Sequence, residues 1–90
     1  MIRKISNSAR KNIEDLDYED QQKIIARLES FQENPFKGEV KKVKGKENIF
    51  REKIDDNRLY FRIIPESKTI DILLYDYRGR IKKKTIQRLK

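Results

Sequence analysis

The chain has 90 residues, enough for one compact domain, and it contains neither cysteine nor histidine. Those absences exclude disulfide bonds, thiolate nucleophiles, imidazole acid–base chemistry and the usual zinc ligands, so we expect no metal and no cofactor. No apolar run is long enough to span a membrane, and no secretory signal follows the first residue. We therefore expect a single soluble, cytoplasmic domain over residues 1–90.

Positive charge is concentrated in the second part of the chain. The formal net charge is +8, from 23 Lys and Arg against 15 Asp and Glu. Residues 7–36 sum to −3, whereas residues 37–90 hold seventeen basic and eight acidic residues and sum to +9. A polyanion is a natural partner for such a surface, because binding of phosphates releases condensed counterions. The plain alternative is a well-solvated surface rich in lysine.

The first elements are a short strand and a short helix. Residues 2–5 can form the strand, and Asn7 or Ser8 can cap the helix that follows. This helix would place three apolar side chains on one face: Ala9, Ile13 and Leu16.

Asp17 is a better N-cap, because its carboxylate can accept from the backbone N–H of Asp20. It starts a second helix whose apolar residues recur at spacings of three and four. They are Ile24, Ile25, Leu28 and Phe31. We expect the helix to reach about Glu33, since Pro35 cannot continue it. The two helices form an amphipathic hairpin that needs a surface to pack on.

Beyond residue 37 the apolar period changes to two, which predicts strands near residues 40–44, 48–54, 58–64 and 69–75. Short connections separate them, at Gly45, Asp55-Asp56-Asn57 and Pro65-Glu66-Ser67-Lys68. Consecutive antiparallel pairing is the simplest topology, and the fold class is α+β. Residues 78–90 then hold seven basic residues and no acidic one, with Ile81, Thr85 and Leu89 four apart, which predicts a short cationic helix.

Alternation places Arg51 and Lys53 on one sheet face, away from the apolar side chains of their strand. The next strand turns polar residues to the same face, and pairing across the tight connection brings Arg58 close to Lys53. These residues are Arg58, Tyr60 and Arg62. Two phenols and another guanidinium are expected at the same rim: Tyr75, Tyr77 and Arg78.

Like charges clustered in this way are costly to bury unless an anion neutralises them, which favours a phosphate site. The alternative is a solvated face whose Lys and Arg discourage edge pairing, and the residues alone support both interpretations equally. Glu52 interrupts the apolar alternation of its strand. We interpret it as an edge-strand residue paired with a nearby cation, rather than as a functional carboxylate.

The order of several short motifs resembles that of the RelE/ParE toxin superfamily over nearly the whole chain. The motifs are Asn34-Pro35-Phe36, Val43-Lys44-Gly45 with Phe50-Arg51, Arg58-Leu59-Tyr60-Phe61, and an apolar strand running to Arg78. The resemblance implies an N-terminal helix hairpin packed on a curved antiparallel sheet, with a short basic C-terminal helix. It also implies a cognate acidic antitoxin as protein partner.

In RelE-like members, basic residues at the positions matching Arg51, Lys53, Arg58 and Arg78 serve ribosome-dependent cleavage of mRNA. The resemblance therefore implies a metal-independent endoribonuclease that acts on mRNA at the ribosome and inhibits translation. ParE-like members act on DNA gyrase and usually lack the full basic set. The chain departs from the RelE pattern because no histidine or tyrosine follows Tyr77, and its last residues also look like a diverged HigB ending.

RNA can be cut without metal when its 2′-hydroxyl attacks the adjacent phosphorus. Arg51 and Arg58 suit the charged phosphorane, because guanidinium groups donate in a planar fork and stay protonated, and Arg78 is a third candidate contact. Lys53, surrounded by cations, is the candidate base. Tyr77 or Tyr75 is the candidate for stacking a base or relaying a proton.

The cations of the tail are expected to bind RNA backbone rather than to react. They include Arg80, Lys82, Lys83, Lys84 and Arg88. Two other functions stay open beside RNA cleavage, namely ParE-like inhibition of gyrase and non-catalytic nucleic-acid binding. Toxicity separates the last from the other two, and cleavage of ribosome-bound transcripts separates the first two from each other.

Overall fold

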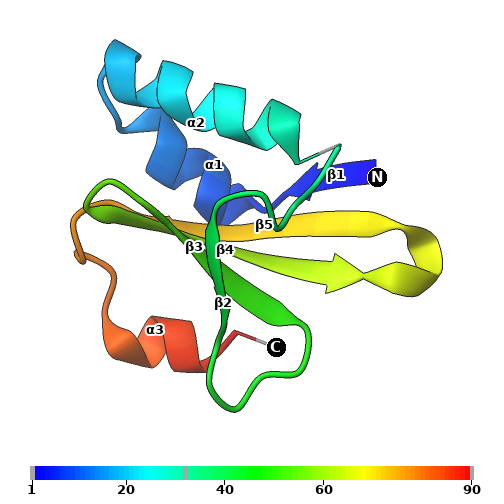
Figure 1. Ribbon diagram of the computed structural model, residues 1–90. Coiled ribbons are helices and arrows are strands. Elements are labelled where there is room, and N and C mark those ends of the chain that lie inside the picture. The colour runs from blue at the N-terminus through cyan, green and yellow to red at the C-terminus, as the bar shows by residue number, and fades with distance from the viewer. Residues whose placement is uncertain (1, 32, 90) are drawn as a thin grey trace.

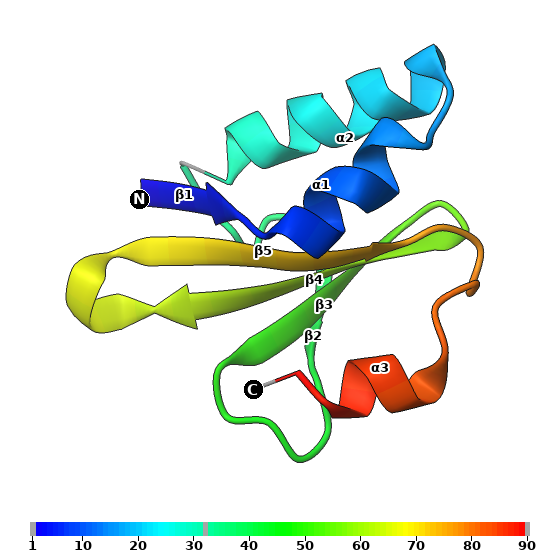
Figure 2. The ribbon, with the colours of Figure 1, turned by 180° about the vertical axis from the view of Figure 1, so that it is seen from behind.

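The computed structural model describes residues 2–31 and 33–89. The elements are β1 (Ile2–Ile5), α1 (Asn7–Glu14), α2 (Tyr18–Ser30), β2 (Glu39–Lys42), β3 (Ile49–Ile54), β4 (Asn57–Ile64), the 3-10 turn η1 (Pro65–Ser67), β5 (Thr69–Asp76) and α3 (Lys83–Gln87). They form three layers, with α1 and α2 on one face of the sheet and α3 on the other (Figures 1 and 2). The predicted α+β architecture, with a helix hairpin, a sheet and a basic C-terminal helix, is confirmed.

The sheet has the strand order β1-β5-β4-β3-β2. Strands β2 to β5 pair consecutively and antiparallel, as their short connections predict. The β3–β4 connection is tighter than expected, because Asn57 already belongs to β4. At the opposite edge, β1 pairs parallel with β5, which departs from a purely antiparallel sheet. This pairing brings the start of α1 onto β5, where the Ser6 N–H donates to the Ile72 carbonyl at 2.9 Å.

The contact with β5 also explains where α1 starts. Its N-cap is Ser6, so the predicted caps, Asn7 and Ser8, are wrong. The Ser6 hydroxyl accepts from the Ala9 N–H at 3.0 Å and donates to the Leu73 carbonyl at 2.8 Å. One side chain thus caps the helix and fastens it to the sheet, which neither of the other two residues can do from inside the helix.

Asp17 caps α2 as predicted, accepting from the Asp20 N–H at 2.9 Å. The helix ends at Ser30, short of the expected end near Glu33. Beyond it the Ser30 carbonyl accepts from the N–H of Glu33 at 3.1 Å and from the N–H of Asn34 at 3.2 Å. The chain then turns back toward the sheet.

The main core lies between the helix hairpin and the sheet. Phe31, the C-cap of α2, meets Phe61 of β4 with ring centroids 4.9 Å apart, and Phe61 in turn stacks on Phe50. The buried side chains of this core are Ala9, Ile24, Leu28, Phe31, Leu59, Phe61, Ile63, Ile70, Ile72 and Tyr75. None of the described helices is long and apolar enough to cross a membrane.

A β-bulge between β4 and β5 changes which side chains face which layer. Tyr60 lies opposite Leu74 but Phe61 lies opposite Ile72, so Leu73 has no partner on β4. An extra residue of this kind bends the strand and reverses its alternation beyond that point. The bulge therefore sets both the curvature of the sheet and the facing of the end of β5.

Because of this reversal, Tyr75 faces the helix hairpin and joins the core, and Asp76 faces α3. The expectation that Tyr75 lies at the cationic rim is wrong. Alternation counted from Ile70 without the bulge gives the opposite facing. The sequence shows no glycine or proline at Leu73 that would have signalled the bulge.

The C-terminal segment crosses to the far face of the sheet, where the Ile81 N–H donates to Asp76 Oδ1 at 2.9 Å (Figure 2). α3 is shorter than the predicted cationic tail, and its inward-facing residue is Ile86, whereas Thr85 is exposed. The predicted four-residue spacing through Thr85 is therefore wrong. Because α3 has only five residues, one partly buried side chain, Ile86, is enough to give it an apolar face.

Candidate active site on the cationic face

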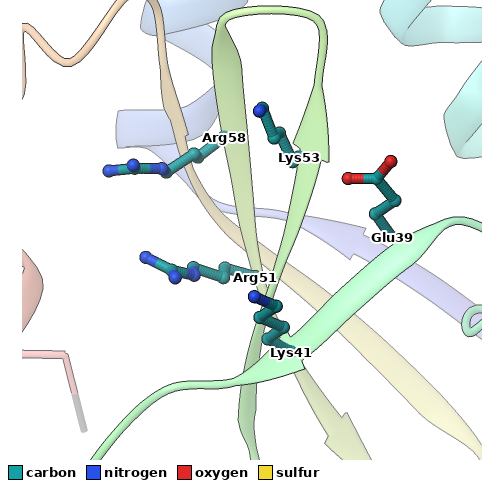
Figure 3. Close-up of a pocket in the computed structure, with 5 residues that line it drawn as sticks. All are labelled: Glu39, Lys41, Arg51, Lys53 and Arg58. Carbon is teal, nitrogen blue, oxygen red and sulfur yellow. The ribbon is translucent and has the colours of Figure 1, made fainter.

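The strand register builds a cluster of cations on the face beneath α3. Lys53 of β3 lies between Arg58 of β4 and Glu39 of β2, and Arg51 lies opposite Lys41. These five side chains line a cavity of about 290 Å³ (Figure 3). Arg51 and Arg58 extend in the same direction, with Lys41 close to Arg51. The structure thus brings together three of the predicted site residues, Arg51, Lys53 and Arg58.

Two residues of this cavity, Glu39 and Lys41, were missed in the sequence. The strand was expected to begin at residue 40, yet β2 starts at Glu39 and places both polar side chains beside those of β3. The available signal was the alternation of Glu39 and Lys41 around Val40, which packs against the main core. That signal spans only three residues and depends on knowing the edge of the sheet.

The cavity is strongly positive. Its lining contains four cations and a single carboxylate, Glu39. Within residues 2–31 and 33–89, carboxylates come within 4 Å of a cation at Lys23–Asp55 and at Arg27–Glu52, and neither pair belongs to the cavity. A cluster with so little internal neutralisation gains from binding an anion, and a phosphate accepts bidentate hydrogen bonds from guanidinium. The arrangement can therefore hold a phosphodiester.

Glu52 faces the opposite side of β3, where Arg27 of α2 donates to both of its carboxylate oxygens, at 2.7 Å to Oε2. The predicted cationic partner is confirmed. The predicted position on an edge strand is wrong, because β3 lies between β2 and β4 and Glu52 is only 3% exposed. Gly38 passes directly over this carboxylate, and a Cβ there would lie 2.9 Å from Glu52 Cδ. The pair joins α2 to the strand that carries Arg51 and Lys53.

Two other predicted residues, Tyr77 and Arg78, stand outside the cavity. The Tyr77 ring packs at the edge of the main core, and the guanidinium groups of Arg78 and Arg80 lie 5.0 and 5.3 Å from its centroid. Arg78 has a left-handed backbone (φ 55°), held by its N–H donating to Asn57 Oδ1 at 2.8 Å. Both residues thus lie just beyond the end of β5 and do not line the cavity.

Tyr75 is too deeply buried to serve the cavity. Burial raises the pKa of its phenol to about 12, while the Asn57 side chain acts in the opposite direction through a hydrogen bond. Its phenol is therefore neutral at any physiological pH. Its backbone N–H donates to Asn12 Oδ1 at 3.3 Å, which ties β5 to α1. The role of Tyr75 is in packing.

A second, larger cavity adjoins the first, between the sheet and α3. It measures about 650 Å³ and shares Arg51 and Arg58 with the smaller cavity. Tyr60 lines it, on the sheet face where alternation placed it, and is 2% exposed because α3 and its neighbours cover that part of the face. Lys83 is the tail cation that lines this cavity. The other predicted RNA-binding cations of the tail are exposed: Arg80, Lys82, Lys84 and Arg88.

Among the described residues, no three carboxylates lie close enough together to hold a metal ion. The side chains that line the smaller cavity offer guanidinium and ammonium groups and one carboxylate.

No protein-family model and no curated protein matches the sequence. Solved structures do match. The archaeal RelE–RelB complex from Pyrococcus horikoshii is 22% identical, with a TM-score of 0.76 over 89% of this chain and 97% of that chain. The isolated E. coli RelE toxin is 16% identical, with a TM-score of 0.73 over 97% and 96%. A YoeB/ParE toxin from Agrobacterium tumefaciens is 15% identical, with a TM-score of 0.73 over 86% and 98%.

At these identities the likeness concerns the fold. The chain has the RelE-like α+β fold along nearly its whole length, and the resemblance to the RelE/ParE superfamily is confirmed at that level.

Proposed function

We propose that the protein is the toxin of a type II toxin–antitoxin system and cuts mRNA on ribosomes without a metal. The observation that carries this proposal is the cavity that Lys41, Arg51, Lys53 and Arg58 line together with a single carboxylate, Glu39. The fold it shares with RelE toxins supports the same class of function. Translation in the cytoplasm would be its target.

The reaction uses the 2′-hydroxyl of the substrate as nucleophile. Its oxygen bonds to the adjacent phosphorus, the bond from phosphorus to the 5′-oxygen breaks, and the departing 5′-oxygen takes a proton from water. Arg51 and Arg58 extend in the same direction and can donate to the two non-bridging oxygens of the phosphorane (Figure 3). Lys41 adds charge beside Arg51. Arg78 and Tyr77 lie beyond the cavity, so we propose for them contacts with the flanking nucleotide, in phosphate binding and base stacking. The exposed cations of the tail would bind the phosphates of the RNA backbone: Arg80, Lys82, Lys84 and Arg88.

Two side chains can take the proton of the 2′-hydroxyl. Lys53 is one candidate, because its amine lines the cavity beside Arg58. Glu39 is the other, because a carboxylate accepts a proton without first losing one, and it lies opposite Lys53 in the register. Whichever of Lys53→Met and Glu39→Gln flattens the pH dependence of cleavage identifies the base.

An acidic antitoxin fits as the cognate partner, since it would neutralise the cationic face and keep RNA away from it. Several solved structures with this fold are toxin–antitoxin complexes. A small acidic gene product that copurifies with the chain and restores growth would identify that partner.

The deciding experiment measures cleavage of ribosome-bound mRNA by the intact protein and by Arg58→Ala. We expect the rate to fall on the order of a hundredfold or more, because one preorganised donor to the phosphorane is lost. Arg62→Ala is the matched control, since Arg62 lies on the same strand and face outside the cavity and should cut at the original rate.

Other outcomes assign other functions. Unchanged cleavage by Arg58→Ala would show that the cavity is not the active site. An intact protein that is toxic without cutting transcripts would favour ParE-like inhibition of gyrase. A protein that binds RNA, is harmless and never cuts would be a non-catalytic member of the fold.

A further inference from the structure

The cavity between the sheet and α3 has a chemistry different from that of the cationic cavity beside it. Its volume of about 650 Å³ falls within the roughly 300–1,000 Å³ of small-ligand sites. Its lining comes from three parts of the chain. Strand β2 and the loop after it contribute Lys42, Val43 and Lys44; strands β3, β4 and β5 contribute Arg51, Arg58, Tyr60 and Asp76; the tail contributes Gly79, Ile81, Lys83, Ile86 and Gln87. The site proposed above uses only two of these residues.

One side of this cavity is apolar. Ile81 and Ile86 line it from the tail, and Tyr60 lines it from β4. Both isoleucines are only partly buried, so an apolar ligand would cover surface that water now contacts. An aromatic base is flat and apolar on both faces and hydrogen-bonds only at its edge. Gln87 and Asp76 supply side-chain donors and acceptors in the same cavity.

The other side is cationic and continuous with the proposed active site. Arg51 and Arg58 line both cavities, so a phosphate bound between them lies at the boundary of the two. We propose that the α3 cavity binds the nucleotide adjoining the cut phosphate, with its base packed on the partly exposed Ile86 of α3, on the side of the cavity that Tyr60 closes. This inference rests on the proposed function of the neighbouring site and adds a subsite that selects the base.

The charge around α3 favours a nucleotide over an uncharged ligand. Lys83 of α3 lies over a cavity that is also lined by the two arginines and by two lysines at the end of β2 and just beyond it, Lys42 and Lys44. The carboxylate in that lining is Asp76, whose Oδ1 already accepts from the Ile81 N–H. A five-residue helix has little stability of its own, so like charges facing one another across it weaken its attachment. A phosphate between the two layers would reverse that repulsion.

The test compares two probes that share a phosphate and differ in the base, adenosine 5′-monophosphate and ribose 5-phosphate, titrated into the full chain by NMR. We expect the nucleotide to bind about tenfold more tightly, the gain typical of stacking one base on a side chain. The amide and methyl signals of Ile86 should shift with the nucleotide and not with the sugar phosphate.

Ile86→Ala should remove most of that preference and leave the affinity for ribose 5-phosphate unchanged, because the phosphate contacts stay. Thr85→Ala is the matched control on the same helix, since Thr85 is exposed and lies outside the cavity. Melting curves of both variants establish that each is folded. Tyr60→Leu offers a second variant on the opposite wall, to be compared in the same titration.

Equal affinities for the two probes, or shifts confined to Lys41 and Lys53, would overturn the proposal even if mRNA cleavage depends on Arg58. Binding of a poly-glutamate peptide at Ile86 without binding of the nucleotide would assign the cavity to a protein partner and also overturn it. Base-dependent binding in a protein that never cuts RNA would retain the subsite and refute the proposed reaction.

Discussion

The two faces of the sheet treat charge in opposite ways, and β3 shows both within three residues. Glu52 points toward α2, is buried, and is fully paired with Arg27. Arg51 and Lys53 point toward α3 and share their cavity with two further cations and one carboxylate. Burying an unpaired charge is costly, so the face beneath the helix hairpin balances its charges internally. On the face beneath α3 the positive charges exceed the negative ones, and a bound anion would balance them.

This difference separates the groups that hold the fold from the groups that are available for binding. On the hairpin side, Phe31, Phe61 and Phe50 form a continuous aromatic core beside the Arg27–Glu52 pair. On the α3 side, packing is limited to a few apolar residues around Tyr60 and the rest is open to solvent. Stability should thus respond to changes on the first face, and ligand binding to changes on the second.

The largest effect on stability is expected for Glu52→Ala. This change leaves the Arg27 guanidinium buried without its carboxylate, which typically costs about 3–5 kcal/mol of unfolding free energy. Chemical denaturation of the two proteins measures it. The matched control is the double variant Arg27→Met with Glu52→Leu, which removes both charges and should recover most of the loss. A single variant as stable as the parent would show that the pair contributes nothing to holding α2 on the sheet.

Much of this arrangement could be predicted from the sequence because it depends on local periodicity. The change from a period near 3.6 to a period of two places the helices and strands, and alternation on β3 and β4 brings Arg51, Lys53 and Arg58 together. Short connections leave little choice of strand order. Asp17 was recognisable as an N-cap because capping depends on residues only three apart.

What could not be predicted depends on contacts between distant parts of the chain. The bulge at Leu73 exchanges the sheet faces on which Tyr75 and Asp76 lie, and no residue type in the strand predicts it. Arg27, the partner of Glu52, is 25 positions away, on a helix whose packing angle cannot be predicted from the sequence. The covering of Tyr60 by the tail likewise needs the position of α3. Each of these features is decided by tertiary packing rather than by local preference.

A smaller, pH-dependent effect is expected at Tyr75, on the hairpin side of the bulge. Burial raises the pKa of its phenol from 10.0 to about 12, so folding favours the neutral form. The stability contributed by this shift is fully present below pH 10, and is lost as the pH rises from 10 through 12. Unfolding free energies of the parent and of Tyr75→Phe, compared across that range, should converge. Parallel curves would mean that the phenol ionises equally in the folded and unfolded chains and that Tyr75 is not buried.

The smallest effect on stability is expected for Lys53→Ala, one residue from Glu52 on the other face. Lys53 is exposed, and no carboxylate lies within 4 Å of its ammonium group in the part of the chain that the structure describes. Removing it loses some attraction to Glu39 and relieves repulsion from Arg58 and Lys41. Changes at such surface positions usually stay within about 0.5 kcal/mol, so the melting temperature should be unchanged or slightly higher.

The same Lys53→Ala protein should bind RNA more weakly and lose activity, because the ammonium group lies in the proposed active site. Thermal melting and RNA affinity, measured on one preparation, therefore test whether the two faces are independent. A melting temperature that drops as far as in Glu52→Ala would mean that Lys53 helps hold the sheet together. The cationic face would then be part of the structural framework, and its charges would no longer point to an absent anion.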